Sequence, residues 1–269
     1  EKKNIKEEIQ MYMDDPVMFM QNDLMENMYH KHPIKYDILG TESSILDIDQ
    51  VLLERTYQHF YHHQNRLLVI AGHMNIDEIK TYFETYEKKY PNQQPKAKTV
   101  FPKEAKHVVI QKDIKYKDVQ MDRLMMGIKL IPRRLSKPKR LIKELAVTML
   151  LNMVLGSSSK LYHELLDQKL INQSFFITSH VEKKAESIMI YGETHDVETL
   201  YQILHQLFIH DLKSYISLEA FERFKKVYVG QFVYALNGLD SKAYLYGKYF
   251  HMNVCLFDVV DLVKQITYE

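Results

Sequence analysis

Two glutamates near the start of the chain have the spacing of side chains that share one helical face. The stretch from Glu1 to Pro16 is rich in Lys, Glu and Met, which are good helix formers. On a helix, Glu1 and Glu8 share a stripe with Ile5 and Tyr12, whose side chains normally face inward. A carboxylate turned inward needs a cation or a donor, and a metal ion is one such partner. The alternative is a solvated face held by local ion pairs, as in many Lys/Glu-rich helices.

Histidines offer two further candidates for metal binding. His30 and His32 are two residues apart, so they point in different directions on a helix, and Pro33 ends the helix there. We interpret His32 as a packing and turn residue. His59 and His63 are one helical turn apart, which is a genuine ligand spacing, but no third ligand at a matching spacing completes a site. We interpret them as part of a histidine-rich helix end.

The pattern around the two glutamates resembles the third-ligand helix of the inverzincin zinc peptidases. This is the pitrilysin or insulinase group (M16), and the sequence is most similar to its bacterial processing-peptidase-like branch. The spacing is Glu-x6-Glu, and the residues that match after it are Ile9, Met11, Tyr12, Asp14, Asp15 and Pro16. The resemblance implies that Glu8 is a zinc ligand and that Glu1 supports the site without touching the metal.

The same resemblance implies where the rest of a zinc site comes from. In this family the other ligands belong to an upstream His-x-x-Glu-His helix, whose glutamate activates the zinc-bound water. The present sequence contains no such motif. A catalytic zinc takes about three protein ligands plus water, so Glu8 alone cannot hold the metal. We therefore expect a fragment, truncated at both ends, that carries one ligand and is inactive by itself.

Further family-like segments follow along the chain in the family's order. They are His32-Pro33, Gly40 to Ile45, Phe60 to Asn65, Arg66 to Gly72 and Leu155 to Leu170. Two positions depart from the pattern, because His73 stands where the family often has Asp and Lys169 where it usually has Gly. The resemblance implies an α+β fold in which each of two domains packs helices on an antiparallel-rich sheet. Such a pair would form half of a metallopeptidase clamshell.

Local sequence patterns divide the chain in the same way. The polar, proline-containing stretch 91–106 reads as a linker between residues 1–90, the end of a first domain, and residues 107–269, a second domain. Alternating or continuous apolar runs predict strands over 66–72, 107–113, 120–131, 174–181 and 187–193. Helical patterns cover 138–155, 197–215, 218–236, 239–252 and 256–265. Gly156 is expected to stop one helix, and Ser158 or Ser159 to start the next.

Composition and charge argue against nucleic-acid binding, an internal disulfide and a membrane span. The net charge is +1 over 269 residues with both signs interspersed, which gives no case for nucleic-acid binding. The densest basic patch, residues 133–140, reads as a solvated loop. The single cysteine, Cys255, excludes an internal disulfide and favours a reducing cytoplasm. No apolar stretch is long enough to span a membrane, so no membrane partner is expected.

Three functional hypotheses follow. The first is a zinc endopeptidase that hydrolyses peptides or unfolded protein segments, or processes precursor peptides, with zinc as cofactor. The second is a non-catalytic subunit of the same family that binds peptide or serves as a dimerisation partner. In both cases we expect a homodimer or a heterodimer with a related subunit, and peptide held as an added strand at a sheet edge. An unrelated helical adaptor, the third hypothesis, explains no specific residue.

Overall fold

The strands that the structure describes form one antiparallel sheet. The computed structural model describes residues 1–61, 65–89 and 99–268. Its strands are β1 (Asp122–Leu130), β2 (Phe176–Glu182) and β3 (Ala185–Thr194), in the order β1-β3-β2. β3 pairs along its length with β1, from Asp122↔Thr194 to Leu130↔Glu186, and a tight turn joins it to β2. With helices packed on this sheet, the predicted α+β class is confirmed.

Helices make up the remaining regular structure of the described residues. The first half contains α1 (Lys2–Asp14), α2 (Pro16–Met28), η1 (Pro33–Lys35), α3 (Glu42–Leu46), α4 (Gln50–Phe60) and α5 (Ile76–Lys89). The second half contains α6 (Lys137–Leu155), α7 (Lys160–Asp167), α8 (Val197–Gln206), the π-helical turn η3 (Leu207–Asp211), η4 (Leu212–Tyr215), α9 (Leu218–Ala235), α10 (Leu239–His251), η5 (Leu256–Asp258) and α11 (Val259–Lys264).

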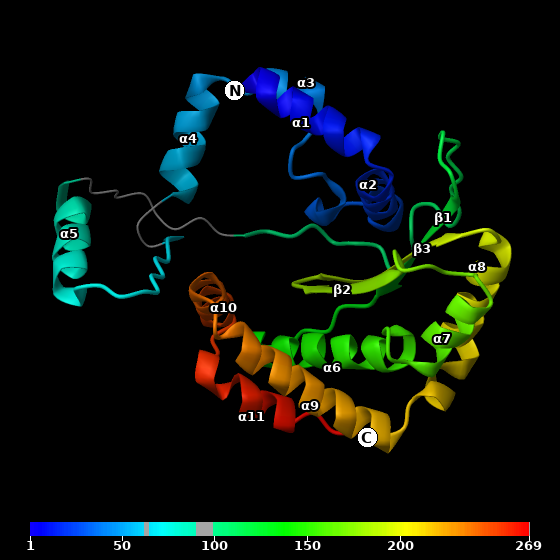
Figure 1. Ribbon diagram of the computed structural model, residues 1–269. Coiled ribbons are helices and arrows are strands. Elements are labelled where there is room, and N and C mark those ends of the chain that lie inside the picture. Colours follow the sequence, from blue (N-terminus) through cyan, green and yellow to red (C-terminus); the bar gives the residue numbers. More distant parts are fainter. Residues whose placement is uncertain (62–64, 90–98, 269) are drawn as a thin grey trace.

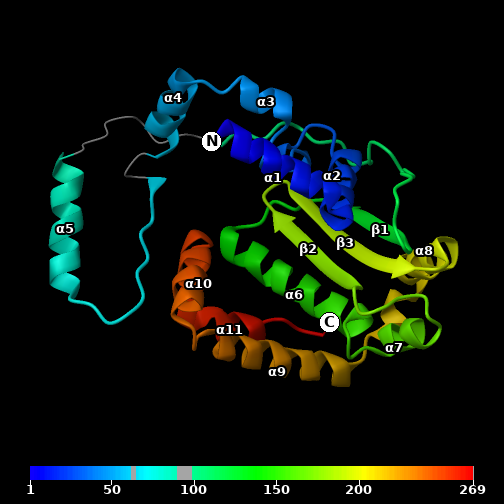
Figure 2. The same cartoon turned by 45° about the horizontal axis from the view of Figure 1, so that its top comes forward.

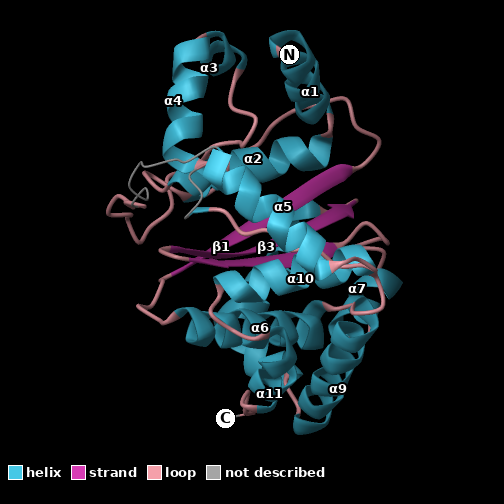
Figure 3. Ribbon diagram, turned by 90° about the vertical axis from the view of Figure 1, so that its left-hand side faces the viewer, coloured by secondary structure: helices cyan, strands magenta, loops and turns pink. Residues whose placement is uncertain are grey.

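The sheet lies between two helical layers. α2 packs against β1 on one face, and α6 lies along the other face with α9 and α11 behind it (Figures 2 and 3). The main core forms between α6 and the sheet, where Leu141, Leu145, Ile188 and Ile190 are buried. On the opposite face, Gly127 of β1 lets α2 approach closely, because an added Cβ would lie 2.9 Å from Leu24 Cδ1.

Short polar residues set two of the helix boundaries. Asp15 ends α1 in an extended conformation, and its carboxylate accepts hydrogen bonds from the backbone N–H groups of Val17 (2.8 Å) and Met18 (2.9 Å). Pro16 therefore begins a new helix instead of kinking a continuous one. As predicted, α6 ends before Gly156, and Ser159 caps α7 by accepting from the Tyr162 N–H at 3.1 Å.

Two predicted strands are not strands in the structure. Residues 66–71 have no regular secondary structure. Leu67, Val69 and Ala71 alternate with the more exposed Leu68 and Ile70, as in a strand, but no described strand pairs with them. Residues 107–113 pair with the end of α2, where the Val109 and Ile110 N–H groups donate to the Asn27 carbonyl. A strand requires a ladder partner as well as the right side-chain pattern.

The first part of the chain contributes helices only, within the residues that the structure describes. The expected second sheet is therefore not seen there, and the division at residues 90 and 106 stays a prediction. α4 and α5 stand apart from the layered part (Figure 1) and expose apolar side chains, among them Val51, Phe60 and Tyr82. In the described ranges no single helix is long and apolar enough to cross a membrane, and only α6 with α7, bent by 41°, meets that test as a pair.

Candidate metal ligand and its supporting network

Helix α1 presents the two predicted site glutamates to solvent. Glu1 is the N-cap residue and Glu8 lies in the helix, and both side chains are exposed, whereas Ile5 and Tyr12 of the same stripe are half-buried. Neither carboxylate forms a hydrogen bond or ion pair with another described residue. The stripe thus lies at the border between the packed and open sides of α1, and Glu8 is free to accept an external cation.

The described residues do not by themselves fit a zinc ion. They contain no group of three or more His, Cys, Asp or Glu side chains placed to hold a metal. His59 uses Nδ1 in a 2.8 Å contact with the Arg55 carbonyl, and His62 and His63 lie outside the described residues. One carboxylate falls short of the three protein ligands of a catalytic zinc site. Glu8 can therefore supply one ligand and no more.

Helix α1 is held mainly through its neighbours α2 and α3. Lys2 Nζ donates to the Leu46 carbonyl at 3.0 Å, and Lys6 lies 3.8 Å from the Glu42 carboxylate. Both contacts are on the surface, where an ion pair contributes about 1 kcal/mol or less. The firmer constraint is α2, which follows directly after Asp15 and packs on β1.

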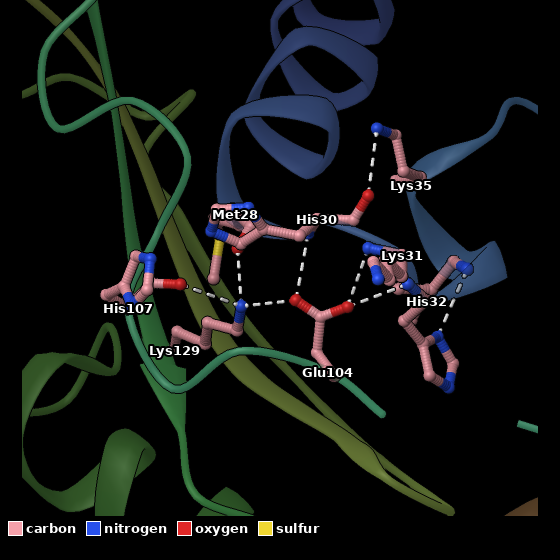
Figure 4. A network of polar contacts seen from close by, with 9 residues as sticks. Met28, His30, Lys31, His32, Lys35, Glu104, His107 and Lys129 are labelled. Carbon is pink, nitrogen blue, oxygen red and sulfur yellow. Dashed lines mark hydrogen bonds and ion pairs between the residues drawn. The ribbon is translucent and has the colours of Figure 1, made fainter. Parts of the chain in front are cut away.

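The far end of α2 is fixed by a buried carboxylate, Glu104. Its two oxygens accept hydrogen bonds of 2.8 Å from the backbone N–H groups of His30, Lys31 and His32 (Figure 4). Oε1 also accepts a 2.8 Å hydrogen bond from Lys129 Nζ. Burial raises the pKa of Glu104, but the hydrogen bonds from Lys129 and the three amides outweigh it and bring the pKa down to about 2.

Lys129 completes the network from the sheet. Besides Glu104, its ammonium group donates to the carbonyls of Met28 at 2.7 Å and His107 at 3.1 Å. All three of its N–H donors are thereby used, and the Met28 carbonyl at the end of α2 gains a partner. The two charged side chains are 5% and 9% exposed, so solvent screens them little. This arrangement joins α2, β1 and residues 104–107, and it favours the ionised form of Glu104.

The prediction for His32 is confirmed by this part of the structure. His32 is 4% exposed, its Nδ1 accepts the Ile34 N–H at 3.2 Å, and its ring stacks on Phe101 with centroids 5.2 Å apart. The sequence pattern did not single out Glu104 as a structural residue, because a glutamate between Lys103 and Lys106 looks like an ordinary solvated charge. Lys129 did carry a signal, since a lysine within an otherwise apolar strand needs a partner.

Comparison with known proteins decides the family. The sequence pattern described as "Peptidase M16 inactive domain" matches residues 48–228. The chain belongs to the M16 peptidase family. It is 33% identical over 272 residues to the "Uncharacterized zinc protease YmfH" of Bacillus subtilis, covering 100% of the chain and 63% of that relative. The M16 chain therefore spans less than two-thirds of the length of this curated relative.

Solved structures share the fold of this chain. The putative M16-like peptidase from Alicyclobacillus acidocaldarius superposes with a TM-score of 0.87 at 27% identity, over 99% of this chain and 64% of that one. A chain of complex III from Candida albicans superposes with a TM-score of 0.68 at 14% identity, over 99% and 64%. The second likeness shows the fold alone.

Proposed function

We propose that this M16 chain is part of a zinc-dependent endopeptidase that cleaves peptides or processes precursor peptides. The observation that carries the proposal is the exposed, unpaired carboxylate of Glu8 on α1. Its position in the Glu-x6-Glu pattern is that of the family's third ligand. In this proposal Glu8 is one zinc ligand, Glu1 orients the site, and the other ligands lie outside the described residues. The relative named as a zinc protease supports the metal.

The proposal includes the arrangement expected from the sequence. Residues 1–90 complete a first α+β domain, residues 107–269 form a second, and the pair acts as half of a clamshell in the cytoplasm. A homodimer, or a heterodimer with a related subunit, then encloses the peptide.

A non-catalytic subunit is the second candidate. The matched family pattern is described as an inactive domain, and the described residues lack a metal-binding group of three ligands. In that case the chain would bind peptide or a partner subunit, and Glu8 would be an ordinary solvated glutamate.

Zinc content separates the two candidates. The measurement is metal analysis of the purified full-length protein, of its Glu8→Gln variant and of a Glu7→Gln control. Glu7 is also exposed on α1 and only 3.8 Å from Lys3, so its change alters the same charge on the same helix. We expect stoichiometric zinc in the parent and the control and a large loss in Glu8→Gln.

Each other outcome has a definite meaning. Absence of zinc from all three proteins would remove the peptidase proposal and favour the non-catalytic subunit. Equal zinc in all three would show that Glu8 is not a ligand. Because Glu8 is exposed and unpaired, its replacement by Gln should leave the circular dichroism spectrum unchanged, which serves as the folding control.

A further inference from the structure

One end of the sheet gathers positively charged side chains from three separate segments. We call this surface the basic end, and all of its members are exposed: Lys103, Lys106, Arg133, Arg134, Lys137, Lys139, Lys183 and Lys184. They come from the stretch before β1, from the loop and first turn between β1 and α6, and from the turn between β2 and β3. The sequence places them up to 81 positions apart, so only the fold assembles them.

The strand register and specific contacts bring these segments together. Leu130, the last residue of β1, pairs with Glu186, so the chain leaves β1 beside the β2–β3 turn that holds Lys183 and Lys184. Lys183 Nζ lies 5.6 Å from the centre of the Phe101 ring, which joins the turn to the stretch before β1. Figure 2 shows the start of α6 near the same end of β2.

The helix α6 and the Glu104 network hold the remaining members of the basic end. Lys143 of α6 forms an ion pair with Glu186, and Lys139 lies one turn earlier on the same helical face. Lys103 and Lys106 flank Glu104, which is fixed to Lys129 of β1. The basic end therefore draws cations from α6, which covers one face of the sheet, and from the stretch that Lys129 links to α2 on the other face.

The charge of the basic end is not neutralised by its own segments. In residues 101–107, 131–140 and 182–186 there are three carboxylates, and two of them, Glu104 and Glu186, are committed to Lys129 and Lys143. Glu182 is the only exposed carboxylate of these segments. None of the eight cations forms an ion pair with another described residue. Eight like charges against one, in a chain whose net charge is +1, repel one another and attract anions.

We propose that the basic end is a docking surface for an acidic polypeptide segment, rich in Asp and Glu. Six of the eight cations are lysines, which act as hydrated point charges on flexible side chains and do not require the fixed bidentate geometry of an arginine site. The association would be fast, sensitive to salt and largely independent of sequence beyond the charge. The surface needs no metal, so this proposal is independent of the role of Glu8.

Other anionic partners match the surface less well. Single-stranded nucleic acid is held by aromatic side chains on which bases stack, as well as by charge. The aromatic ring in these segments, Phe101, is already stacked on His32 and approached by Lys183. A membrane surface favours an amphipathic element with several exposed apolar side chains. These segments expose one large apolar side chain, Ile131.

Fluorescence anisotropy of a labelled oligoglutamate, about 15 residues long, tests the proposal with the full-length protein. We expect binding at about 50 mM salt that weakens strongly at about 300 mM, because screening shortens the reach of the charges. The variant Lys183→Glu/Arg134→Glu reverses two charges in different segments and should bind about tenfold more weakly or worse. The control Lys213→Glu/Lys226→Glu makes the same charge change at exposed positions of η4 and α9, and should stay within about twofold of the parent.

The competing partners are measured alongside. Labelled oligouridylate and vesicles containing phosphatidylserine replace the oligoglutamate in the same assay. The proposal is overturned if oligoglutamate does not bind, if the control loses as much affinity as the test variant, or if either competitor binds more tightly than oligoglutamate. Since all four substituted side chains are exposed, unchanged thermal unfolding confirms that the variants are folded.

Discussion

Removal of the Glu104 carboxylate is the sharpest test of how α2 is fixed to the sheet. The change is Glu104→Gln, which keeps the shape of the side chain and removes its charge. A fall in the pKa of Glu104 from 4.5 to about 2 corresponds to about 3 kcal/mol of stability at neutral pH, since each pKa unit is worth about 1.4 kcal/mol. The substitution also leaves the ammonium of Lys129, whose side chain is 5% exposed, without its anion. We expect the loss in unfolding free energy at pH 7 to be about 3–5 kcal/mol.

The pH dependence gives this prediction a second, independent readout. Because the folded-state pKa of Glu104 lies below its unfolded value, its contribution is fully present above pH 4.5 and is lost as the pH falls toward about 2. The difference in stability between the parent protein and Glu104→Gln should therefore shrink across that window. Taking the difference between the two proteins cancels the titration of the other carboxylates.

Urea unfolding followed by circular dichroism, at a series of pH values, measures both quantities. The matched control is the double variant Glu104→Gln/Lys129→Met, in which the unpaired ammonium is also removed. It should be more stable than Glu104→Gln, since a buried charge without its partner is the costlier state. A loss below about 0.5 kcal/mol, or a difference that stays constant down to pH 2.5, would refute this account of the network.

Three smaller changes test other parts of the packing. Gly127→Val should cost about 1–3 kcal/mol in urea unfolding, because the new side chain would collide with Leu24 and Met28 of α2; equal stability would contradict that close approach. Gly230→Ala in α9, where an added Cβ meets nothing within 4 Å, should instead raise the unfolding free energy by up to about 1 kcal/mol, and a loss would show hidden crowding. Ser159→Ala should lower the thermal midpoint, at a cost of about 1 kcal/mol, by removing the cap of α7; an unchanged midpoint would show that the cap is dispensable.

Elements whose signal is local were predictable from the sequence. The expected helix 138–155 corresponds to α6 at Lys137–Leu155, and the strands expected over 174–181 and 187–193 correspond to β2 and β3. Their apolar periodicity, helix-stop glycine and capping serine all lie within a few residues of the element itself. The helix expected over 197–215 was less regular than predicted, because α8 gives way at Leu207 to a π turn and then a 3-10 turn.

Features that depend on distant partners were not predictable in the same way. Arg66 to Gly72 has the composition of a buried strand, but strand formation is decided by a neighbour that local sequence does not specify. Glu104 and Lys129 are 25 residues apart, and no pattern connects them until β1 and the end of α2 lie side by side. The basic end shows the same limit more clearly. The sequence reveals residues 133–140 as a basic patch, but that this patch lies near Lys183 and Lys184 follows from the strand register.

The role proposed for Glu8 depends on that same distant network. A metal ligand acts only if its helix is held in place relative to the other ligands. The polar contacts of α1 with α3, made by Lys2 and Lys6, lie on the surface, whereas α2 continues directly from α1 and ends in the Glu104 network. Loosening this anchor should therefore weaken metal binding without touching a ligand, whereas Glu8→Gln removes the ligand and leaves the anchor intact. If the Glu104→Gln protein is folded but holds less zinc than the Glu7→Gln control, the Glu104 network helps to position Glu8. If it holds full zinc, α1 is positioned independently of the sheet.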